Sequence, residues 1–237
     1  MGKRGPKLKE PVTRKWDTNL AYCVGLIATD GCLYNDGRHM SFTSADIQLV
    51  QLFKDLMRLS NRIGYKISGS SGRKCPHLQF GNVGFYRWLV EIGITPRKSL
   101  TLGRLDIPNQ YLIDFVRGCF DGDGSIYSYM DRRWPSSYMF YLSFASGSKI
   151  FIDWLRSRLK DALGISGYIS ESRGRNFYQL KFAKSESIVL IRKMYYTKQV
   201  PCLQRKREKI IAILKKHKKI QLENPRIFLK LTPEIKI

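Results

Sequence analysis

Two aspartates occupy matching places in two short segments of this sequence. Residues 23–31 read CVGLIATDG and residues 116–124 read VRGCFDGDG, so each segment is a mainly apolar run that ends in Asp-Gly. An apolar run of this kind predicts a buried helix. Each predicted helix carries one carboxylate, Asp30 or Asp123, at its C-terminal end.

Small residues predict how these two helices pack. They recur four positions apart in each segment, at Gly25 and Thr29 and at Gly118 and Gly122. Residues four apart share a helix face, so these pairs allow the helices to approach side by side and bring Asp30 next to Asp123. Gly31 and Gly124 are expected to end the helices by adopting a left-handed conformation.

A carboxylate pair at two helix C-termini is unfavourable without a counter-ion, because the helix dipoles and the two charges repel each other. A divalent cation relieves both penalties. Hard oxygen ligands favour Mg²⁺, which binds through one or two carboxylates together with substrate phosphates. Such a cation can activate water and stabilise a leaving oxygen, so the pair points to phosphodiester hydrolysis.

The similarity extends well beyond the two motifs. Residues 39–53 (HMSFTSADIQLVQLF) parallel residues 141–155 (YLSFASGSKIFIDWL), and residues 77–80 (HLQF) parallel residues 179–182 (QLKF). Both pairs are separated by the same offset, 141 − 39 = 102 and 179 − 77 = 102. A constant offset over this distance indicates two copies of one unit.

Each unit is predicted to run helix, strand, strand, helix, strand, strand, helix. Expected helices lie at 19–29, 47–58 and 150–163, and Asn35-Asp36-Gly37 predicts a hairpin turn. Strands at 39–43, 76–80 and 177–182 alternate apolar and polar residues, so each antiparallel sheet has one apolar and one polar face. The fold class is α+β, with two pseudo-symmetric αββαββα repeats. The predicted domains are a basic N-terminal arm (1–16), a first repeat (17–105), a second repeat (106–220) and a C-terminal tail (221–237).

The charge balance suggests a polyanionic partner. The chain has 42 Lys and Arg against 19 Asp and Glu, a net charge of +23, and a folded protein this basic repels itself. Charge alone is equally compatible with a ribosome-associated basic protein. The scattered cysteines and the lack of an apolar leader predict an intracellular protein, in a prokaryotic cytoplasm or an organelle matrix, that is neither secreted nor in a membrane.

The two motifs resemble the LAGLIDADG motif of homing endonucleases. Residues 25–31 keep Gly-Leu-Ile and the final Asp-Gly, whereas residues 118–124 keep the Gly and Asp-x-Asp-Gly. Two motifs in one chain resemble the monomeric, pseudo-dimeric branch of that family. The first motif departs from the pattern, because Ala28 stands where the second has Asp121; that inner aspartate is usually a capping or packing residue.

The resemblance implies a set of site residues. Asp30 and Asp123 are the catalytic metal ligands, and the backbone carbonyls of Thr29 and Gly122 complete the metal shell. The implied basic residues near each centre, Lys98 and Lys206, orient water or stabilise developing phosphate charge. Two polar residues at the start of the next helix are implied to order water, Asp46 and Ser148. The implied cofactor is Mg²⁺, with Mn²⁺ as a substitute and Ca²⁺ binding without cleavage.

The family also implies that both sheets form a saddle along the DNA major groove, with the motif helices packed at the central interface. Polar-face residues and hairpin arginines would contact bases or phosphates. In the first half these are Arg38, His39, Ser41, Thr43, Arg73, Lys74, His77 and Gln79. In the second half they are Tyr127, Tyr129, Arg132, Arg133, Tyr141, Ser143, Arg173, Arg175, Gln179 and Lys181. The two sets differ, so the double-stranded DNA target should be asymmetric.

Three functions remain open from the sequence. The first is a site-specific DNA endonuclease of intron homing that makes a double-strand break. The second is an RNA maturase that binds its host intron RNA, and the third is a non-cleaving DNA-binding regulator. Retention of both acids and both lysines favours the first, because a silent regulator has little reason to keep an electrostatically costly carboxylate pair.

Overall fold

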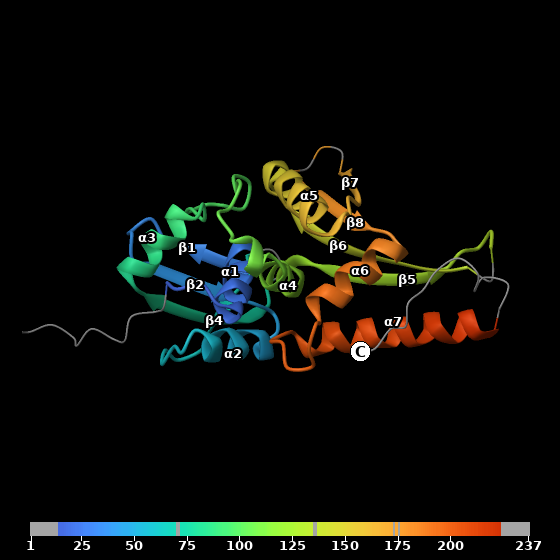
Figure 1. Ribbon diagram of the computed structural model, residues 1–237. Helices are drawn as coiled ribbons and strands as arrows, with labels where there is room; N and C mark the ends of the chain where they lie inside the picture. Colours follow the sequence, from blue (N-terminus) through green and yellow to red (C-terminus); the bar gives the residue numbers. More distant parts are fainter. Residues whose placement is uncertain (1–13, 70–71, 135–136, 173, 175, 224–237) are drawn as a thin grey trace, which may run out of the picture.

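The computed structural model describes residues 14–69, 72–134, 137–172, 174 and 176–223 (Figure 1). Over these residues the chain forms two successive α+β repeats. Within this part of the chain, no helix is both long enough and apolar enough to cross a membrane.

The first repeat has the predicted element order. Its elements are α1 (Thr18–Asp30), β1 (Gly31–Leu33), β2 (His39–Thr43), α2 (Ile47–Leu56), β3 (Gly64–Ile67), β4 (Lys74–Gly81) and α3 (Val83–Glu91). The strands form one antiparallel sheet in the order β1-β2-β4-β3. The predicted helix at 47–58 is too long: it ends at Leu56, and Arg58 adopts a left-handed φ of 51°.

The second repeat has the same order, followed by one additional helix. A short 3-10 turn, η1 (Asn109–Tyr111), precedes it. Its elements are α4 (Leu112–Asp123), β5 (Ser125–Met130), β6 (Tyr138–Ser146), α5 (Lys149–Leu163), β7 (Tyr168–Glu171), β8 (Tyr178–Phe182), α6 (Lys184–Met194) and α7 (Gln204–Glu223). The sheet order β5-β6-β8-β7 matches the first sheet strand for strand. The predicted pair of αββαββα repeats is therefore confirmed.

Each sheet buries one face, as the alternation of residues predicts. In the first sheet Met40, Phe42, Leu78 and Phe80 are buried in the core, where α2 and α3 pack against the strands. In the second sheet the buried positions include Phe140, Leu142, Phe144, Leu180 and Phe182, which lie under α5 and α6. Among the described residues, no helix in Figure 1 covers the opposite face of either sheet.

The helices α1 and α4 pack side by side between the two sheets (Figure 1). A Cβ atom added to Gly25 would lie 2.2 Å from the Phe115 carbonyl oxygen, and one added to Gly118 would lie 2.1 Å from the Tyr22 carbonyl oxygen. Any larger residue would therefore push the backbones apart. The predicted close packing through small residues is confirmed, and we call this α1–α4 interface the motif seam.

The prediction that Gly31 and Gly124 end these helices in a left-handed conformation is wrong. Both residues have φ −77° and ψ 156°, which is extended backbone open to any residue. Glycine is needed at both positions because there is no room for a Cβ atom. A Cβ on Gly31 would lie 2.7 Å from Ile27 Cα, and a Cβ on Gly124 would lie 2.6 Å from Phe120 Cα. The turn from helix into strand is thus too tight for a side chain.

Candidate active site at the motif seam

The acidic residues of both motifs lie at the same end of the motif seam. Asp30 is half-buried and Asp123 is exposed. Asp30 Oδ2 lies 3.3 Å from the position that a Cβ of Gly122 would occupy, so the first carboxylate sits against the last turn of α4. The structure therefore brings together the two aspartates that the sequence pairs.

The surroundings of this pair penalise negative charge. Desolvation by the surrounding protein, with a further contribution from the charge of Asp123, raises the pKa of Asp30 to about 7. Desolvation also raises the pKa of Asp123. The ammonium groups of Lys98 and Lys206 oppose both shifts but do not cancel them. A bound cation would stabilise the ionised form of both carboxylates and so offset this penalty.

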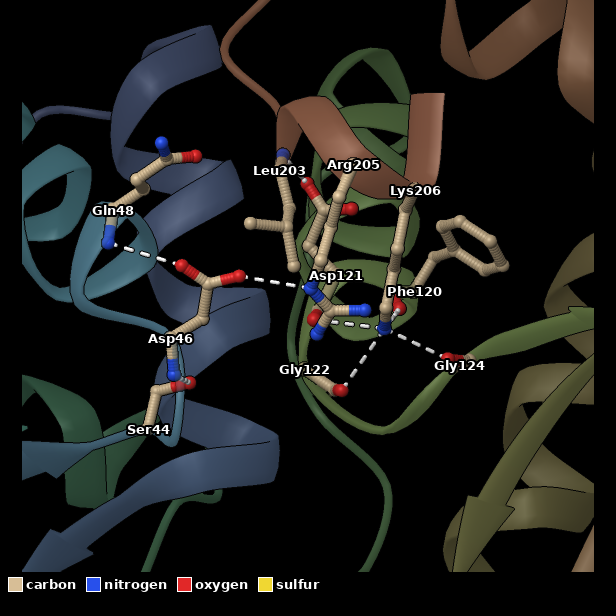
Figure 2. A network of polar contacts seen from close by, with 10 residues as sticks. All are labelled: Ser44, Asp46, Gln48, Phe120, Asp121, Gly122, Gly124, Leu203, Arg205 and Lys206. Carbon is tan, nitrogen blue, oxygen red and sulfur yellow. Dashed lines mark hydrogen bonds and ion pairs between the residues drawn. The ribbon is translucent and has the colours of Figure 1, made fainter. Parts of the chain in front are cut away.

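Lys98 and Lys206 lie beneath the ends of the two motif helices, one in each repeat. Both are almost completely buried, at 6% and 9% exposure. Lys98 Nζ donates a hydrogen bond to the Thr29 carbonyl at 3.0 Å. Lys206 Nζ lies 2.6–3.1 Å from the carbonyls of Phe120, Asp121, Gly122 and Gly124 (Figure 2). Each lysine thus holds the C-terminal end of one motif helix.

Two of these lysine contacts involve the backbone carbonyls of Thr29 and Gly122, which the sequence analysis expects to bind the metal. The Thr29 carbonyl accepts a hydrogen bond from Lys98, and the Gly122 carbonyl accepts one from Lys206. A carbonyl oxygen has two lone pairs, so one remains for a second partner. Burial lowers the pKa of Lys206 to about 8, while nearby aspartates oppose that shift. Burial also lowers the pKa of Lys98.

Asp121, the inner aspartate of the second motif, is a buried connector. Its Oδ2 accepts hydrogen bonds from the Tyr22 hydroxyl and from the Leu203 backbone N–H, both at 2.7 Å. The first contact crosses the motif seam, and the second holds the start of α7, where Lys206 lies. The sequence predicts a packing or capping role for this aspartate but does not reveal these partners.

A buried ion pair that the sequence analysis missed holds the segment before α7. The Arg117 guanidinium donates to Asp114 Oδ1 at 2.7 Å and to the Met194 and Pro201 carbonyls at 2.9 Å each. Arg117 is fully buried. The available signal was the spacing of Asp114 and Arg117, three apart in a mainly apolar helix, since a buried charge is usually paired.

The predicted water-ordering residues Asp46 and Ser148 are the N-caps of α2 and α5. Asp46 Oδ1 accepts from Gln48 N–H at 3.0 Å, and its Oδ2 pairs with Arg205 Nε at 2.8 Å (Figure 2). Ser148 donates to the Leu102 carbonyl at 2.6 Å and is only 2% exposed. In this structure both side chains are engaged in structural contacts, and a role with water remains a prediction.

The second repeat matches a known protein family. Residues 110–194, which run from η1 to the end of α6, match the family described as LAGLIDADG-like domain. The second repeat is therefore a LAGLIDADG-like domain. The resemblance inferred from the two motifs is thereby confirmed. No curated protein matches the sequence.

Solved structures share this LAGLIDADG fold at low sequence identity. The LAGLIDADG meganuclease I-AabMI bound to uncleaved DNA has a TM-score of 0.60 at 12% identity, over 88% of this chain and 92% of that one. Variants of the homing endonuclease I-DmoI have a TM-score of 0.52 at 15% identity, over 81% and 96%. Full-length DUF199/WhiA from Thermatoga maritima has a TM-score of 0.55 at 15% identity, over 94% of this chain. This chain spans only 65% of that WhiA chain.

The open face of the first LAGLIDADG sheet carries the predicted polar residues. His77 Nδ1 lies 2.7 Å from Thr43 Oγ1, and Gln79 is exposed. His39 pairs with Asp36. Ser41 points to this side but is only 5% exposed, so it is not available for a base contact in this structure. The hairpin residues of this half are exposed: Arg38, Arg73 and Lys74.

The open face of the second sheet differs in chemistry. Tyr127 and Tyr129 are exposed, whereas Tyr141, Gln179 and Lys181 are half-buried. Ser143 is only 2% exposed and its hydroxyl pairs with Ser125 at 2.8 Å, so, like Ser41, it is covered. Arg132 and Arg133 are exposed, and Arg133 pairs with Asp131. Arg173, Arg175 and the basic arm 1–13 lie outside the described residues.

The donor set at the motif seam fits a hard divalent cation bound partly by substrate. Among the described residues, no group of three or more His, Cys, Asp or Glu side chains forms a metal site. Asp30 and Asp123 supply carboxylate oxygens from two different helices, and both have raised pKa values. Mg²⁺ ordinarily keeps several waters and uses one or two carboxylates with substrate phosphates, so two acids are sufficient.

Proposed function

We propose that this protein is a site-specific homing endonuclease that makes a double-strand break in a long, asymmetric DNA target. The observation that carries the proposal is the motif seam. It places one carboxylate from each repeat at a shared edge and one buried lysine under each motif helix. Each repeat thus contributes one acid and one lysine, as expected of an enzyme that cuts two strands.

In this proposal Asp30 and Asp123 would hold Mg²⁺, and the bound cation would supply an activated water and stabilisation of the leaving oxygen. Lys98 and Lys206 keep the two helix ends in place and add positive charge close to the phosphates. Mn²⁺ is expected to replace Mg²⁺, and Ca²⁺ to support binding without cleavage. A variant of I-DmoI, whose fold this chain shares, was solved with its target DNA in the presence of 2 mM Mn.

Double-stranded DNA is the proposed partner because both open sheet faces and a net charge of +23 favour a long polyanion. The two faces carry different side chains, so the two half-targets should differ in sequence. Both motifs lie in one chain, so the proposed active form is a monomer. Intron homing is proposed from the family resemblance alone.

The decisive test is to remove one carboxylate charge at a time. Asp30→Asn and Asp123→Asn should each abolish double-strand cleavage in Mg²⁺, because the cation loses a ligand that an amide replaces poorly. Target binding measured in Ca²⁺ should change little. The substrate is a duplex selected from a randomised library by the wild-type protein, and products are resolved by strand on denaturing gels.

Asp161→Asn is a matched control, because Asp161 is exposed on α5. It should cleave at the wild-type rate. Cleavage of both strands at the wild-type rate by either motif variant would show that the active-site assignment is wrong.

A non-cleaving DNA-binding protein is the second candidate, and the WhiA match favours it. It predicts selective binding by the wild-type protein without strand cleavage in either Mg²⁺ or Mn²⁺. The same experiment therefore separates the two candidates. A maturase role with intron RNA rests on the family resemblance and stays a prediction.

A further inference from the structure

Four tyrosines gather on the open face of the second sheet. Tyr127 and Tyr129 come from β5, Tyr141 from β6 and Tyr168 from β7. Tyr127 lies directly opposite Tyr141, and Tyr168 lies opposite Lys181, whose other neighbour is Ser143. Cross-strand partners share a face, so all four rings project away from the core. We call them the tyrosine stack.

The rings of the tyrosine stack are already ordered against one another. Tyr127 and Tyr141 have ring centroids 5.4 Å apart at 16°, and Tyr129 and Tyr141 lie 6.3 Å apart at 5°. Tyr168 meets Tyr141 edge-on at 88°. Each near-parallel pair turns one face of each ring toward its neighbour. This leaves fewer ring faces free for stacking on unpaired bases, which need an open ring face.

The tyrosine stack stays uncharged and partly accessible. Tyr127, Tyr129 and Tyr168 are 39%, 43% and 45% exposed. A hydrogen bond with Tyr129, together with desolvation, raises the pKa of Tyr141 to about 12. Desolvation also raises the pKa of Tyr127. At neutral pH the surface is therefore a wall of apolar ring edges with neutral hydroxyls.

The corresponding face of the first sheet has a different character. Its described residues include His39, Thr43, His77 and Gln79, which are hydrogen-bonding groups. Hydrogen-bonding side chains read the donors and acceptors of base edges. The major groove offers one apolar group that an apolar protein surface can recognise, the C5 methyl group of thymine. The two half-targets would thus be recognised by different chemistry.

We infer that the tyrosine stack reads thymine methyl groups, so that the half-target under the second sheet is rich in thymine. This rests on the DNA-binding part of the proposed function and does not require cleavage. Because the rings are ordered before DNA arrives, contact costs little side-chain entropy. Lys181, whose Nζ lies 6.0 Å from the Tyr168 ring centroid, adds a positive charge that holds the duplex against the wall.

The test replaces thymine with deoxyuridine, which removes only the methyl group. Duplexes are first selected from a randomised library by binding in Ca²⁺. Each thymine of the selected duplex is then replaced, one half at a time, and the Kd is measured. We expect binding to weaken about fourfold for each contacted methyl lost, the effect of exposing one methyl-sized group. The loss should be confined to one half of the duplex.

Three protein variants assign the effect to the tyrosines. In the double variant Tyr127→Ser with Tyr129→Ser, deoxyuridine should no longer weaken binding in the sensitive half. Tyr127→Phe with Tyr129→Phe should retain the sensitivity, because the rings remain. Tyr65→Ser is the matched control: Tyr65 is 66% exposed but lies opposite the core-facing Pro76, away from the open face. Thermal unfolding of each variant checks that the fold is kept.

Several outcomes would overturn the inference. These are selection of no preferred sequence, equal deoxyuridine effects in the two halves, no effect in either half, and unchanged sensitivity in the serine double variant. Cleavage of the selected duplex with no deoxyuridine effect would leave the endonuclease proposal standing and reject only this one. Binding that depends on the thymine methyl groups, without any cleavage, would support this inference and reject the endonuclease proposal.

Discussion

Asp121 and Ala28 occupy matching positions in the two motifs, yet only the aspartate makes polar contacts. Its carboxylate connects Tyr22 on α1 with Leu203 ahead of Lys206. Lys206 in turn binds four carbonyls, whereas Lys98 donates to one, that of Thr29. At the scale of single residues, the two half-centres are therefore constructed differently, although their acids and lysines correspond.

Asp30 should make the metal-free protein less stable as pH rises. Burial raises its pKa to about 7, from the value of about 3.9 that is ordinary for an aspartate. Between these values the folded protein holds a proton that the unfolded chain has lost, so the free energy of unfolding falls with increasing pH. Asp30→Asn should stabilise the chelator-treated protein by about 1–2 kcal/mol at pH 8 and have little effect at pH 4. Urea unfolding at both pH values measures this.

Asp161→Asn again serves as the control and should not change the pH dependence. Adding Mg²⁺ should reduce the difference between wild type and Asp30→Asn at pH 8, because the cation compensates the carboxylate charge. A variant that is less stable than wild type at pH 8 without metal would contradict the electrostatic account of this site.

At the scale of elements, the contact between α1 and α4 depends on the absence of two side chains. In Gly118→Ala the new Cβ would meet the Tyr22 carbonyl oxygen at 2.1 Å, and a backbone atom cannot rotate away. We expect a loss of about 1–3 kcal/mol in the free energy of unfolding, typical of overpacking. Cleavage should fall as the two aspartates are displaced. Urea unfolding and strand-cleavage rates measure the two effects.

Gly103→Ala is the matched control, since a Cβ there meets nothing within 4 Å and the residue does not have a left-handed φ. Its stability should stay within about 0.5 kcal/mol of wild type. If Gly118→Ala were as stable and active as this control, the helices could adapt their spacing and the motif seam would not fix the acids.

The order of elements was predictable because it depends on local periodicity and on the repeat. The alternation of Met40 and Phe42 with polar neighbours correctly gave the buried face of β2. The way the motif helices end was not predictable. Gly31 is compatible with a left-handed cap and with a tight extended turn, and in the structure its backbone is extended and its Cα packs too close to Ile27 for a side chain. Local sequence does not contain that distance.

At the scale of the whole molecule, the pairing of Asp30 with Asp123 was predictable because the two copies carry small residues at matching helix positions, which lets the two motif helices pack together. Contacts that break the symmetry could not be predicted in this way. Asp46 pairs with Arg205, whereas its counterpart Ser148 binds the Leu102 carbonyl. Burial of Ser41 and Ser143 was likewise invisible, because alternation assigns a side chain to a face without showing what covers it.

The charge of the whole molecule should make DNA binding strongly dependent on salt. A net charge of +23 favours many phosphate contacts, each of which releases counter-ions. Between 50 and 200 mM NaCl we expect affinity for the selected duplex to fall by roughly 10³–10⁵, the range for about 6–10 neutralised phosphates. Fluorescence anisotropy in Ca²⁺ gives the slope. An affinity independent of salt would contradict binding along the duplex backbone.

The contacts that follow each repeat cross over to the other one. Leu102, beyond α3, accepts from the cap of α5, and Arg205, at the start of α7, pairs with the cap of α2. A hybrid made by splicing the front half of this chain to the rear half of a relative would sever both connections at once. To keep both contacts, a hybrid would need the segment that follows each repeat to match the helix cap that it contacts in the other repeat. A stretch of chain that can be exchanged without loss is therefore longer than one repeat.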